Sequence, residues 1–277
     1  MRIAHLGPAG TYTEVASRAW YPGAELLPVA SVPVAIDTVV RGEADAAVCA
    51  MENSIEGTAS IETLDLLIRE DFPLKVCGEV VVGVRHMLVG TPGTDPATAT
   101  EVHSHPSALL QCRRTLATLA PNAKPAAALS TAGAIEAAMH APGTLAIGNE
   151  RSAELYGATI LARDIGDEPG NETRFVALSR DVPTPTGDDK TSMAFVTQHD
   201  RPGSLVDVLN LFAGRGLNMT RIESRPTRRQ LGTYVFFVDV QGHQDDAAVA
   251  EVLTEARAIT HWLRVLGSYP RWSRAAV

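Results

Sequence analysis

The spacing of apolar positions changes along the chain and divides it into two regions. In the N-terminal region, short apolar runs alternate with segments whose apolar residues recur every three or four positions, as in strands followed by helices. Between the regions, "DVPTPTGDDK" at 181–190 interrupts the apolar runs with two prolines, a glycine and three acidic residues. Such a stretch predicts an interdomain linker. We therefore expect one domain at 1–180 and another, with a C-terminal tail, at 191–277.

The N-terminal region contains the elements expected of an α/β fold. Thr11 and Glu14 have the spacing of a capping box, which predicts that a helix begins at this point. The β-branched run at 76–90 is long enough for buried or crossing strands. Further strands are expected at 2–7, 45–51 and 144–149, and further helices after 51, over 106–119, near 131–140 and near 149–156. The pattern predicts an α/β domain wound in two lobes.

The C-terminal region is shorter and more regular. Strands are expected at 191–197, 219–224, 233–240 and 262–267, and helices at 202–214 and around 249–256, where apolar residues have helical spacing. The resulting order is βαββαβ. This order predicts a ferredoxin-like α+β domain, in which an antiparallel sheet carries both helices on one face.

Composition narrows the function classes. The formal net charge is −8 and no Lys/Arg run occurs, which disfavours nucleic acid and anionic membranes as partners. Residues 1–30 lack the pattern of a signal peptide and no apolar run is long enough to span a membrane, so we expect a cytoplasmic protein. The three cysteines include no C-x-x-C pair and are interpreted as reduced structural residues. His103 and His105 form an H-x-H pair without a third ligand cluster, so no metal site is predicted.

Four segments place small polar side chains next to Gly or Pro where a loop meets a strand or helix. They are "GPAGTYTE" at 7–14, "MENSIEGTAS" at 51–60, "HSHPSALLQC" at 103–112 and "NETRF" at 171–175. Backbone N–H groups at such junctions favour anions. Each segment also has an ordinary interpretation: Thr11 and Thr13 as helix caps, 52–54 as a polar turn, and Arg174 as a surface ion-pair residue. Spacing alone therefore indicates only a small-anion site without an activated nucleophile.

The combination of these segments resembles the signature of prephenate dehydratase. The similarity is carried by Gly7–Thr13, Glu52-Asn53-Ser54 with Gly57, Ser104-His105-Pro106 with Gln111-Cys112, and Asn171–Phe175. In the C-terminal region, "RPGSL" at 201–205 and "NMTRIESRP" at 218–226 look like a regulatory ACT domain. The resemblance covers nearly the whole chain.

The resemblance implies a two-lobed, periplasmic-binding-protein-like catalytic domain and a specific reaction. The enzyme would be a lyase of phenylalanine biosynthesis that converts prephenate to phenylpyruvate with loss of water and carbon dioxide, using neither a metal nor an organic cofactor. By similarity, the catalytic residues would be Thr173, Arg174, Asn53, Glu52, Ser104 and Gln111. The substrate-binding residues would be Thr11, Thr13, Ser54 and Phe175.

The ACT resemblance implies allosteric feedback inhibition by phenylalanine. The effector site would comprise Gly203, Ser204, Leu205, Leu217, Asn218, Met219, Glu223 and Ser224. Exposed edges of a ferredoxin-like sheet favour pairing with another copy, so we expect a homodimer or homotetramer. Two alternatives remain open at this point: an arogenate dehydratase, and a non-catalytic amino-acid-binding sensor.

Overall fold

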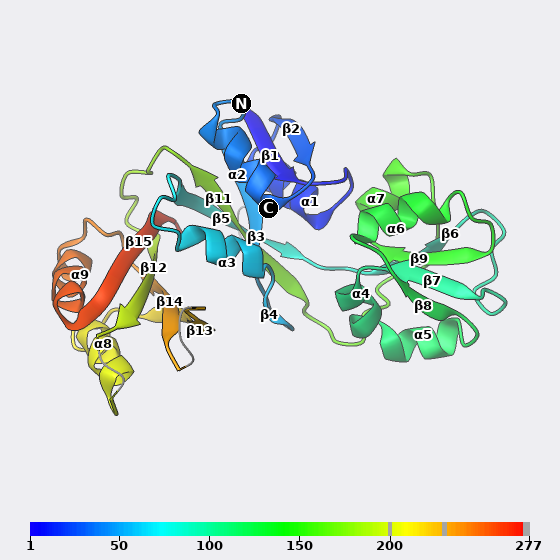
Figure 1. Cartoon of the computed structure of the whole chain (residues 1–277). Helices are drawn as coiled ribbons and strands as arrows, with labels where there is room; N and C mark the ends of the chain where they lie inside the picture. Colours follow the sequence, from blue (N-terminus) through cyan, green and yellow to red (C-terminus); the bar gives the residue numbers. More distant parts are fainter. Residues whose placement is uncertain (199–200, 229–231, 274–277) are drawn as a thin grey trace. The chain divides into compact units, whose positions relative to one another are not determined.

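A computed structural model describes residues 1–198, 201–228 and 232–273 of the chain (Figure 1). Packing divides the chain into two compact units. The N-terminal unit comprises Met1–Ile61 and Val80–Phe175, and the C-terminal unit comprises Glu62–Glu79 and Val176–Val277. The C-terminal unit thus takes in a segment from the first half of the sequence.

The first sheet of the fold has the strand order β2-β1-β3-β11-β5, with β4 paired to β3. Its last two strands are β11 (Glu172–Ser179) and β5 (Lys75–Gly83). Its first elements are β1 (Arg2–Leu6), α1 (Tyr12–Trp20), β2 (Glu25–Val29), α2 (Val32–Val40), β3 (Ala46–Asn53) and β4 (Gly57–Thr58). Strand β1 runs parallel to both β2 and β3, and its central residues Ile3 and Ala4 are completely buried. The strand predicted at 2–7 is confirmed, and the structure places it in the interior of the sheet.

The second sheet has the order β10-β6-β9-β7-β8 and is covered on both faces. Its strands are β6 (Met87–Gly90), β7 (Glu101–Ser104), β8 (Lys124–Ala127), β9 (Thr144–Gly148) and β10 (Thr159–Ala162). The helices are α4 (Pro106–Gln111), α5 (Arg113–Leu119), α6 (Thr131–Ala138) and α7 (Glu150–Leu155). Alternate residues of β6 enter different cores: Leu88 packs with α4 and α5, and Val89 packs with α6 and α7. Figure 1 shows the two helix pairs on opposite sides of the sheet.

Two crossing segments connect these sheets, so that the α/β fold consists of two lobes. The apolar run at 76–90 forms β5 (Lys75–Gly83) in the first sheet and then β6 in the second. Strand β11 (Glu172–Ser179) begins beside this crossing, where the Val84 N–H donates to the Asn171 carbonyl over 2.8 Å. The predicted crossing strands and the two-lobed α/β architecture are confirmed.

The remainder of the chain forms the predicted βαββαβ fold. Its elements are β12 (Asp189–Thr197), α8 (Ser204–Ala213), β13 (Met219–Pro226), β14 (Tyr234–Gln241), α9 (Ala247–Ile259) and β15 (Thr260–Pro270). All pairs in the β13-β14-β12-β15 sheet are antiparallel. Strand residues such as Phe195 and Val238 share one core with Phe212 of α8 and Val252 of α9. The C-terminal unit also contains α3 (Ile61–Leu67) from residue 62 onward and the first half of β5.

Three local features differ from the sequence expectations. The single helix expected over 106–119 is broken at Cys112, whose φ of −112° and ψ of 7° separate α4 from α5. Strand β12 already begins at Asp189, within the predicted linker, because Asp189 pairs with Pro270 of β15, and its buried carboxylate also accepts hydrogen bonds from Thr186. The Glu14 carboxylate accepts from the Gly10 N–H rather than from Thr11, so the capping box is shifted by one residue. The domain limits at 180 and 191 stay a prediction.

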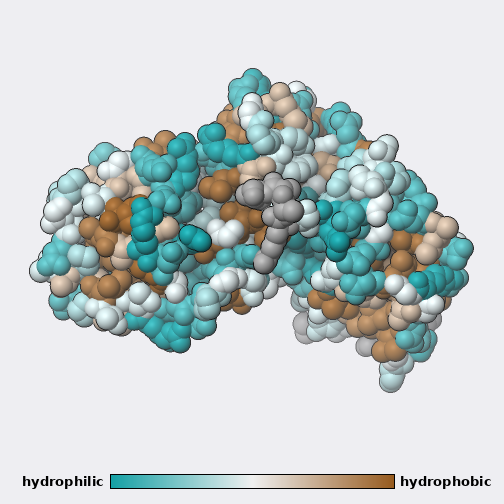
Figure 2. All heavy atoms as spheres, turned by 180° about the vertical axis from the view of Figure 1, so that it is seen from behind, coloured by the Kyte–Doolittle hydropathy of each residue, from teal (hydrophilic) through white to brown (hydrophobic). Residues whose placement is uncertain are grey.

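The surface carries scattered apolar side chains. Leu110, Leu129 and Ile222 are among the exposed large hydrophobic residues. Figure 2 shows brown patches interspersed with teal and white over the visible face. Scattered exposure of this kind is ordinary for folded proteins. None of the helices among the described residues combines the length and apolar character that crossing a membrane requires.

Candidate functional site

Asn53, the last residue of β3, lies next to the beginning of β11. Its carbonyl Oδ1 accepts hydrogen bonds from the Ile55 and Glu56 N–H groups, over 2.9 and 3.0 Å. Because a backbone N–H can only donate, these two bonds determine which way round the Asn53 amide lies. Its Nδ2 group therefore faces β11 and donates to Asn171 Oδ1, to the Glu172 carbonyl and to Thr173 Oγ1.

The Thr173 hydroxyl accepts one of the hydrogen bonds that the Asn53 amide donates. Its Oγ1 is 2.9 Å from Asn53 Nδ2 and accepts the hydrogen bond, since an amide NH2 group has no acceptor function. The Thr173 residue is 7% exposed. No other described residue bonds to the Thr173 side chain, so its hydroxyl proton is not committed within the described structure. The hydroxyl is thus oriented as a donor toward whatever binds beside it.

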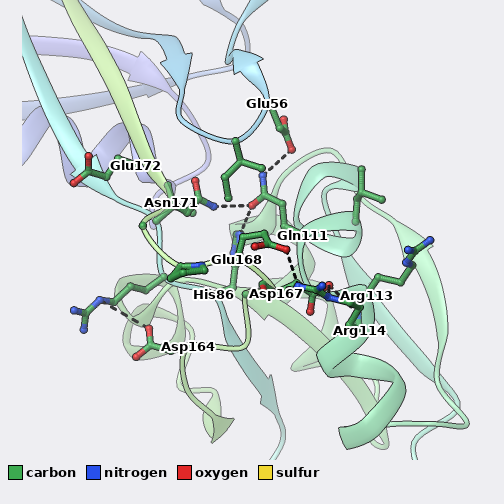
Figure 3. Close-up of a pocket in the computed structure, with 17 residues that line it drawn as sticks. Glu56, His86, Gln111, Arg113, Arg114, Asp164, Asp167, Glu168, Asn171 and Glu172 are labelled. Atoms are coloured by element: carbon green, nitrogen blue, oxygen red, sulfur yellow. Dashed lines mark hydrogen bonds and ion pairs between the residues drawn. The ribbon is translucent and has the colours of Figure 1, made fainter.

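A chain of amides extends from Asn53 to the second lobe, and Figure 3 shows its links from Asn171 through Gln111 to Glu56. Asn171 Nδ2 donates to Gln111 Oε1 over 2.8 Å, and Gln111 Nε2 donates to Glu56 Oε1 over 2.7 Å. Both amides have defined orientations, because Asn171 must accept from Asn53 and the Glu56 carboxylate can only accept. We call Asn53, Asn171, Gln111 and Thr173 the amide network. It joins the end of β3, the end of α4 and the beginning of β11.

His86, from the crossing between β5 and β6, also bonds to Gln111. Its Nε2 lies 2.8 Å from Gln111 Oε1, and Figure 3 shows the ring beside the Gln111 side chain. Because Oε1 is an acceptor, His86 Nε2 must carry the proton and donate. Nδ1 is buried and has no hydrogen-bond partner among the described residues. Burial lowers the pKa of His86 below its usual range and keeps the ring neutral.

Ser54 fastens the segment that leads into β11. Its Oγ donates to the Gly170 carbonyl over 3.1 Å and accepts from the Glu172 N–H over 2.9 Å. The Ser54 N–H donates to the Glu172 carbonyl over 2.9 Å. These three bonds hold 170–172 against the loop after β3. Ser54 therefore supports the site through the backbone, and its predicted substrate contact stays a prediction.

Arg174 and Glu52 form an ion pair next to the amide network. Arg174 Nε is 3.0 Å from Glu52 Oε2, and the Arg174 side chain is 8% exposed whereas that of Glu52 is 38% exposed. The ordinary surface ion pair considered for Arg174 is therefore not what the structure contains, because the guanidinium is buried. Phe175, the next residue, is 2% exposed and packs in the interior.

Three further predicted site residues, Ser104, Thr11 and Thr13, have no side-chain hydrogen bond to the amide network among the described residues. Ser104 is completely buried, and its Oγ donates to the Ile147 carbonyl over 2.8 Å. Thr11 caps α1: its Oγ1 accepts from the Glu14 N–H and donates to the Leu6 carbonyl. The Thr13 side chain, in the first turn of α1, has no hydrogen bond to any described residue. The roles predicted for these residues in binding and catalysis stay predictions.

A cavity of about 820 Å³ lies against the amide network (Figure 3). The network borders it at Gln111 and Asn171, and Arg113, Arg114, Asp167 and Glu168 lie around it. Arg114 is occupied there, because it donates to the Asp167 carbonyl and to Glu168 Oε1. Neither Thr173 nor Arg174 lines this cavity, so it adjoins the site rather than defining it.

The structure offers no activated thiol and no metal cluster among the described residues of this region. Burial raises the pKa of Cys112 to about 12, which keeps the thiol protonated. His105 Nδ1 accepts from the Ser107 N–H as the cap of α4, and His103 pairs with Glu101. Both histidines were expected to be loop residues with hydrogen-bond partners; both have partners, but His103 lies in strand β7. Within 1–198, 201–228 and 232–273, no group of three His, Cys, Asp or Glu side chains is arranged to hold a metal ion.

The residues predicted for the effector site lie around the start of α8 and along β13. Gly203 has a φ of 88°, the left-handed region that favours glycine, and is the N-cap of α8. A cavity of about 360 Å³ is bordered there by Arg201, Ser204 and Asp207. Leu205, Leu217 and Met219 pack partly buried against the core, the Asn218 carbonyl accepts from the Gln241 N–H, Glu223 pairs with Arg221, and Ser224 lies opposite Phe236 in the sheet.

Asn171, His86 and Glu56 take part in the site although no role was predicted for them. Asn171 and Glu56 belong to the segments "NETRF" and "MENSIEGTAS", which were already identified from the sequence as parts of a candidate site. Their place in these segments could therefore have indicated a role. His86 lies inside the strand-like "VRHMLVG", where an isolated polar residue carries no local signal of its partner. Its contact with Gln111 spans 25 residues and depends on the crossing of β5 into β6.

Comparisons with known proteins agree along the whole chain. A family model described as prephenate dehydratase matches residues 3–183, and one described as ACT domain matches 192–258. The chain is 40% identical over 288 residues to the prephenate dehydratase of Mycobacterium sp. (strain JLS), covering 99% of this chain and 90% of that protein. It is 39% identical over 286 residues to arogenate dehydratase 1 of Petunia hybrida, covering 98% and 67%.

Solved structures show the same similarity. The prephenate dehydratase of Arthrobacter aurescens, in complex with L-Phe, is 38% identical with a TM-score of 0.87, over 98% of this chain and 90% of that one. A protein described as GqqA, a novel type of quorum quenching acylase, is 33% identical with a TM-score of 0.85, over 98% of each chain.

Proposed function

The chain belongs to the prephenate dehydratase family, a family of enzymes, and we propose that it is a lyase that converts prephenate to phenylpyruvate. In this reaction the bond to the ring carboxylate breaks, carbon dioxide leaves, and the electron pair enters the ring. The ring C–O bond breaks with its pair on oxygen, and one proton completes the water. Aromatisation supplies driving force, so the enzyme has to hold the dianion and donate to the leaving hydroxyl.

The direction of the hydrogen bond between Asn53 and Thr173 carries the proposal. Thr173 Oγ1 accepts from Asn53 Nδ2 over 2.9 Å, which leaves its own proton to donate. A threonine hydroxyl is a weak acid. We therefore assign Thr173 the role of a preorganised hydrogen-bond donor that polarises the leaving oxygen and stabilises charge as it develops there.

Arg174 is proposed to orient a carboxylate of the substrate. Its guanidinium is buried and its plane is held by the bond from Nε to Glu52, which suits fork-like recognition of a carboxylate. The Thr13 hydroxyl and the N–H groups at the start of α1 are proposed to assist. Thr11 contributes by capping α1, and Ser104 by supporting β7 from within.

Three residues are proposed to position the Thr173 hydroxyl rather than to react: Gln111, Asn53 and Ser54. Asn53 holds the Thr173 hydroxyl directly, Gln111 acts on it through Asn171, and Ser54 fixes the chain that precedes it. Phe175 is proposed to anchor the beginning of β11 by packing in the interior. With this assignment, the reacting groups are hydrogen-bond donors and a cation rather than a nucleophile.

The ACT-domain match at 192–258 supports allosteric regulation, and we propose L-phenylalanine as the feedback inhibitor. The related Arthrobacter aurescens structure is a complex with L-Phe. The N–H groups after Gly203 are proposed to meet the effector carboxylate, and Asn218 and Glu223 its ammonium group. Leu205, Leu217 and Met219 are proposed to border the ring.

A homodimer or homotetramer is proposed as the working form. The βαββαβ sheet ends on β13 and β15, and strand edges commonly pair with a second copy in symmetric assemblies. Light scattering of the purified protein measures the mass directly. A mass of one chain at working concentration would overturn this proposal of assembly.

Arogenate, the aminated analogue of prephenate, is the second candidate substrate. The relative from Petunia hybrida, an arogenate dehydratase, makes this alternative specific. The two substrates differ only at the side-chain keto or amino group. The ratio of kcat/KM for the two, measured side by side, decides between them.

The direct test is to mix the purified protein with prephenate and to follow phenylpyruvate by its absorbance in alkali, with and without L-phenylalanine. A folded Thr173→Val variant purified in parallel controls for host enzyme. Formation by the native protein that phenylalanine suppresses would support both assignments. Formation that is indifferent to phenylalanine would keep the reaction and remove the effector. Absence of product from prephenate and from arogenate would overturn the proposed activity and favour an amino-acid-binding sensor.

A further inference from the structure

A buried imidazole, that of His86, bonds to Gln111 at the end of the amide network opposite Thr173. His86 is 4% exposed, and its ring packs edge-on against Tyr12 at a centroid distance of 6.2 Å. Tyr12 in turn donates to the Arg85 carbonyl over 2.6 Å. An apolar residue would fill the same space without leaving Nδ1 unpaired. A buried nitrogen without a partner is costly, so the imidazole needs a compensating role.

The only described hydrogen bond of the His86 ring is the one to Gln111, and its direction is determined. Gln111 Oε1 accepts from both His86 Nε2 and Asn171 Nδ2, each over 2.8 Å. The second lone pair of Oε1 is thereby satisfied, and the opposite end of the amide is held by Glu56. Without His86, one of the three bonds that hold the Gln111 side chain is lost. Gln111 could then rotate and release Asn171, which bonds to Asn53.

We propose that His86 is a positioning residue of the reaction: as an uncharged Nε2–H donor it locks Gln111, and through Asn171 and Asn53 it holds the Thr173 hydroxyl in its donor orientation. The proposal rests on the proposed function for its kinetic consequences. His86 does not touch the reacting atoms. It instead fixes the geometry of the amide network, and Thr173, the last member of that network, contacts the reacting atoms.

The kinetic test compares His86→Phe with His86→Gln. Phenylalanine keeps the ring against Tyr12 but has no donor, whereas the glutamine NH2 group can reach the place of Nε2–H. We expect His86→Phe to lower kcat about 10-fold with KM within about 2-fold, and His86→Gln to restore most of kcat, because one buried hydrogen bond is at stake. His103→Phe, a change on β7 outside the network, is the matched control and should leave kcat unchanged.

A mutant cycle separates positioning from general stability. If His86 acts through Gln111, His86→Phe should cost nothing further in a Gln111→Leu background. An equal loss in both backgrounds would overturn the proposal, as would a His86→Phe enzyme with native kcat or a His86→Gln enzyme no better than His86→Phe. Should His86→Phe fail to fold, the ring tautomer of His86 in the native protein decides the proposal instead.

A measurement independent of turnover distinguishes failure of this proposal from failure of the proposed function. Nitrogen-15 NMR of the labelled native protein reports the tautomer of His86. A neutral ring with the proton on Nε2 is expected. A proton on Nδ1 would place a lone pair against Gln111 Oε1 and would overturn the proposal even in an enzyme that turns over prephenate. If prephenate is not a substrate, the tautomer still tests the network.

Discussion

Asn53 Nδ2 and Thr173 Oγ1 are joined by a hydrogen bond of 2.9 Å across 120 residues of sequence. The bond has one possible direction, because Asn53 Oδ1 is occupied by two backbone N–H groups. An amide that is held by the main chain at one end thus presents its NH2 group to a buried hydroxyl. As a result, the Thr173 hydroxyl accepts the Asn53 hydrogen bond and its own proton is available to donate to a bound molecule.

Replacement of Thr173 by valine should remove the donor while keeping the shape of the side chain. We expect kcat for prephenate to fall about 100-fold, the typical cost of one preorganised donor. Asn53 Nδ2 keeps Asn171 Oδ1 and the Glu172 carbonyl as acceptors, so the melting temperature should change little. Thr173→Ser, which keeps the hydroxyl, should retain most of the activity. Near-native turnover by folded Thr173→Val would remove Thr173 from the reaction.

Asn53→Asp tests the direction of the bond rather than its presence. Aspartate keeps the acceptor for the Ile55 and Glu56 N–H groups but replaces the NH2 group by an oxygen. The Thr173 hydroxyl would then donate to the carboxylate and be withdrawn from the substrate. We expect kcat to fall about 100-fold. Asn122→Asp, the same change at an exposed loop residue that bonds to the Ala97 carbonyl, is the control and should be silent. A folded Asn53→Asp enzyme with more than about a tenth of native kcat would contradict the assigned direction.

The buried pair of Lys190 and Glu79 should dominate the electrostatic stability of the C-terminal unit. Lys190 Nζ donates to both carboxylate oxygens, over 2.7 and 2.8 Å, and the Glu79 side chain is 1% exposed. Lys190→Met would leave a buried carboxylate without its cation and should cost about 3–5 kcal/mol of unfolding free energy. Chemical denaturation measures this loss.

The exposed pair of Arg41 and Glu43 supplies the matched comparison, because Arg41→Met removes the same kind of contact in water. We expect that change to have no measurable effect on stability. The double variant Lys190→Met, Glu79→Leu should recover some of the loss. Equal effects of Lys190→Met and Arg41→Met would show that burial does not strengthen the contact.

Gly267 in β15 should tolerate no side chain. A Cβ built at this position would lie 2.0 Å from the Val76 carbonyl oxygen and 2.8 Å from its carbonyl carbon, and neither backbone atom can move aside cheaply. Gly267→Ala should lower the stability of the C-terminal unit by at least about 1–3 kcal/mol, the usual cost of overpacking. Gly83→Ala is the control, since nothing lies within 4 Å of its Cβ position. Similar melting curves for the two variants would disprove the close approach of β15 to β5.

Stability should fall as the pH drops below about 6.5. Burial lowers the pKa of both His5 and His86, so the unfolded chain takes up protons near pH 6.5 while the folded chain does not. Unfolding free energy is then highest above pH 6.5, decreases as the pH falls through it, and levels off below the folded pKa values. Carboxyl groups such as Glu14, whose pKa is lowered in the fold, add to the loss only at lower pH.

Thermal melting between about pH 7.5 and 5.5 measures this dependence, and His86→Gln should flatten it. A constant melting temperature across the range would mean that neither histidine is held neutral by the fold. A variant as steep as the native protein would place the effect on His5 alone.

The sequence predicted those elements of the fold that depend on local periodicity. The βαββαβ order and the strands at 2–7 and 76–90 follow from spacing, and the structure confirms them. Helix α2 was not predicted, because "VPVAIDTVV" is rich in β-branched residues and has only Asp37 and Thr38 as polar positions. It forms a helix because Ser31 caps it and Val32, Ala35, Ile36 and Val39 are buried by packing. The break at Cys112 likewise has no local breaker residue.

The site was predictable as a set of segments and not as a set of bonds. The family resemblance assigned Asn53, Gln111 and Thr173 to one site. It could not predict their hydrogen bonds, because the bonded residues are 60 to 120 positions apart in sequence and meet only where the two lobes are connected. Ser104 illustrates the limit. Its position in "HSHP" indicates function, yet its hydroxyl turns inward to the Ile147 carbonyl. Which way a small polar side chain points is decided by tertiary packing, which spacing does not encode.

The amide network has one more consequence, which concerns the solvent. The links from Gln111 through Asn171 and Asn53 to Thr173 join uncharged groups at 2.8 to 2.9 Å, largely out of contact with water. Mobile ions screen interactions between exposed charges over about 8 Å at physiological ionic strength, but they have nothing to screen along a chain of neutral amides. The grip on the Thr173 hydroxyl is therefore insensitive to the salt content of the cell, whatever salt does to the encounter with a doubly charged substrate.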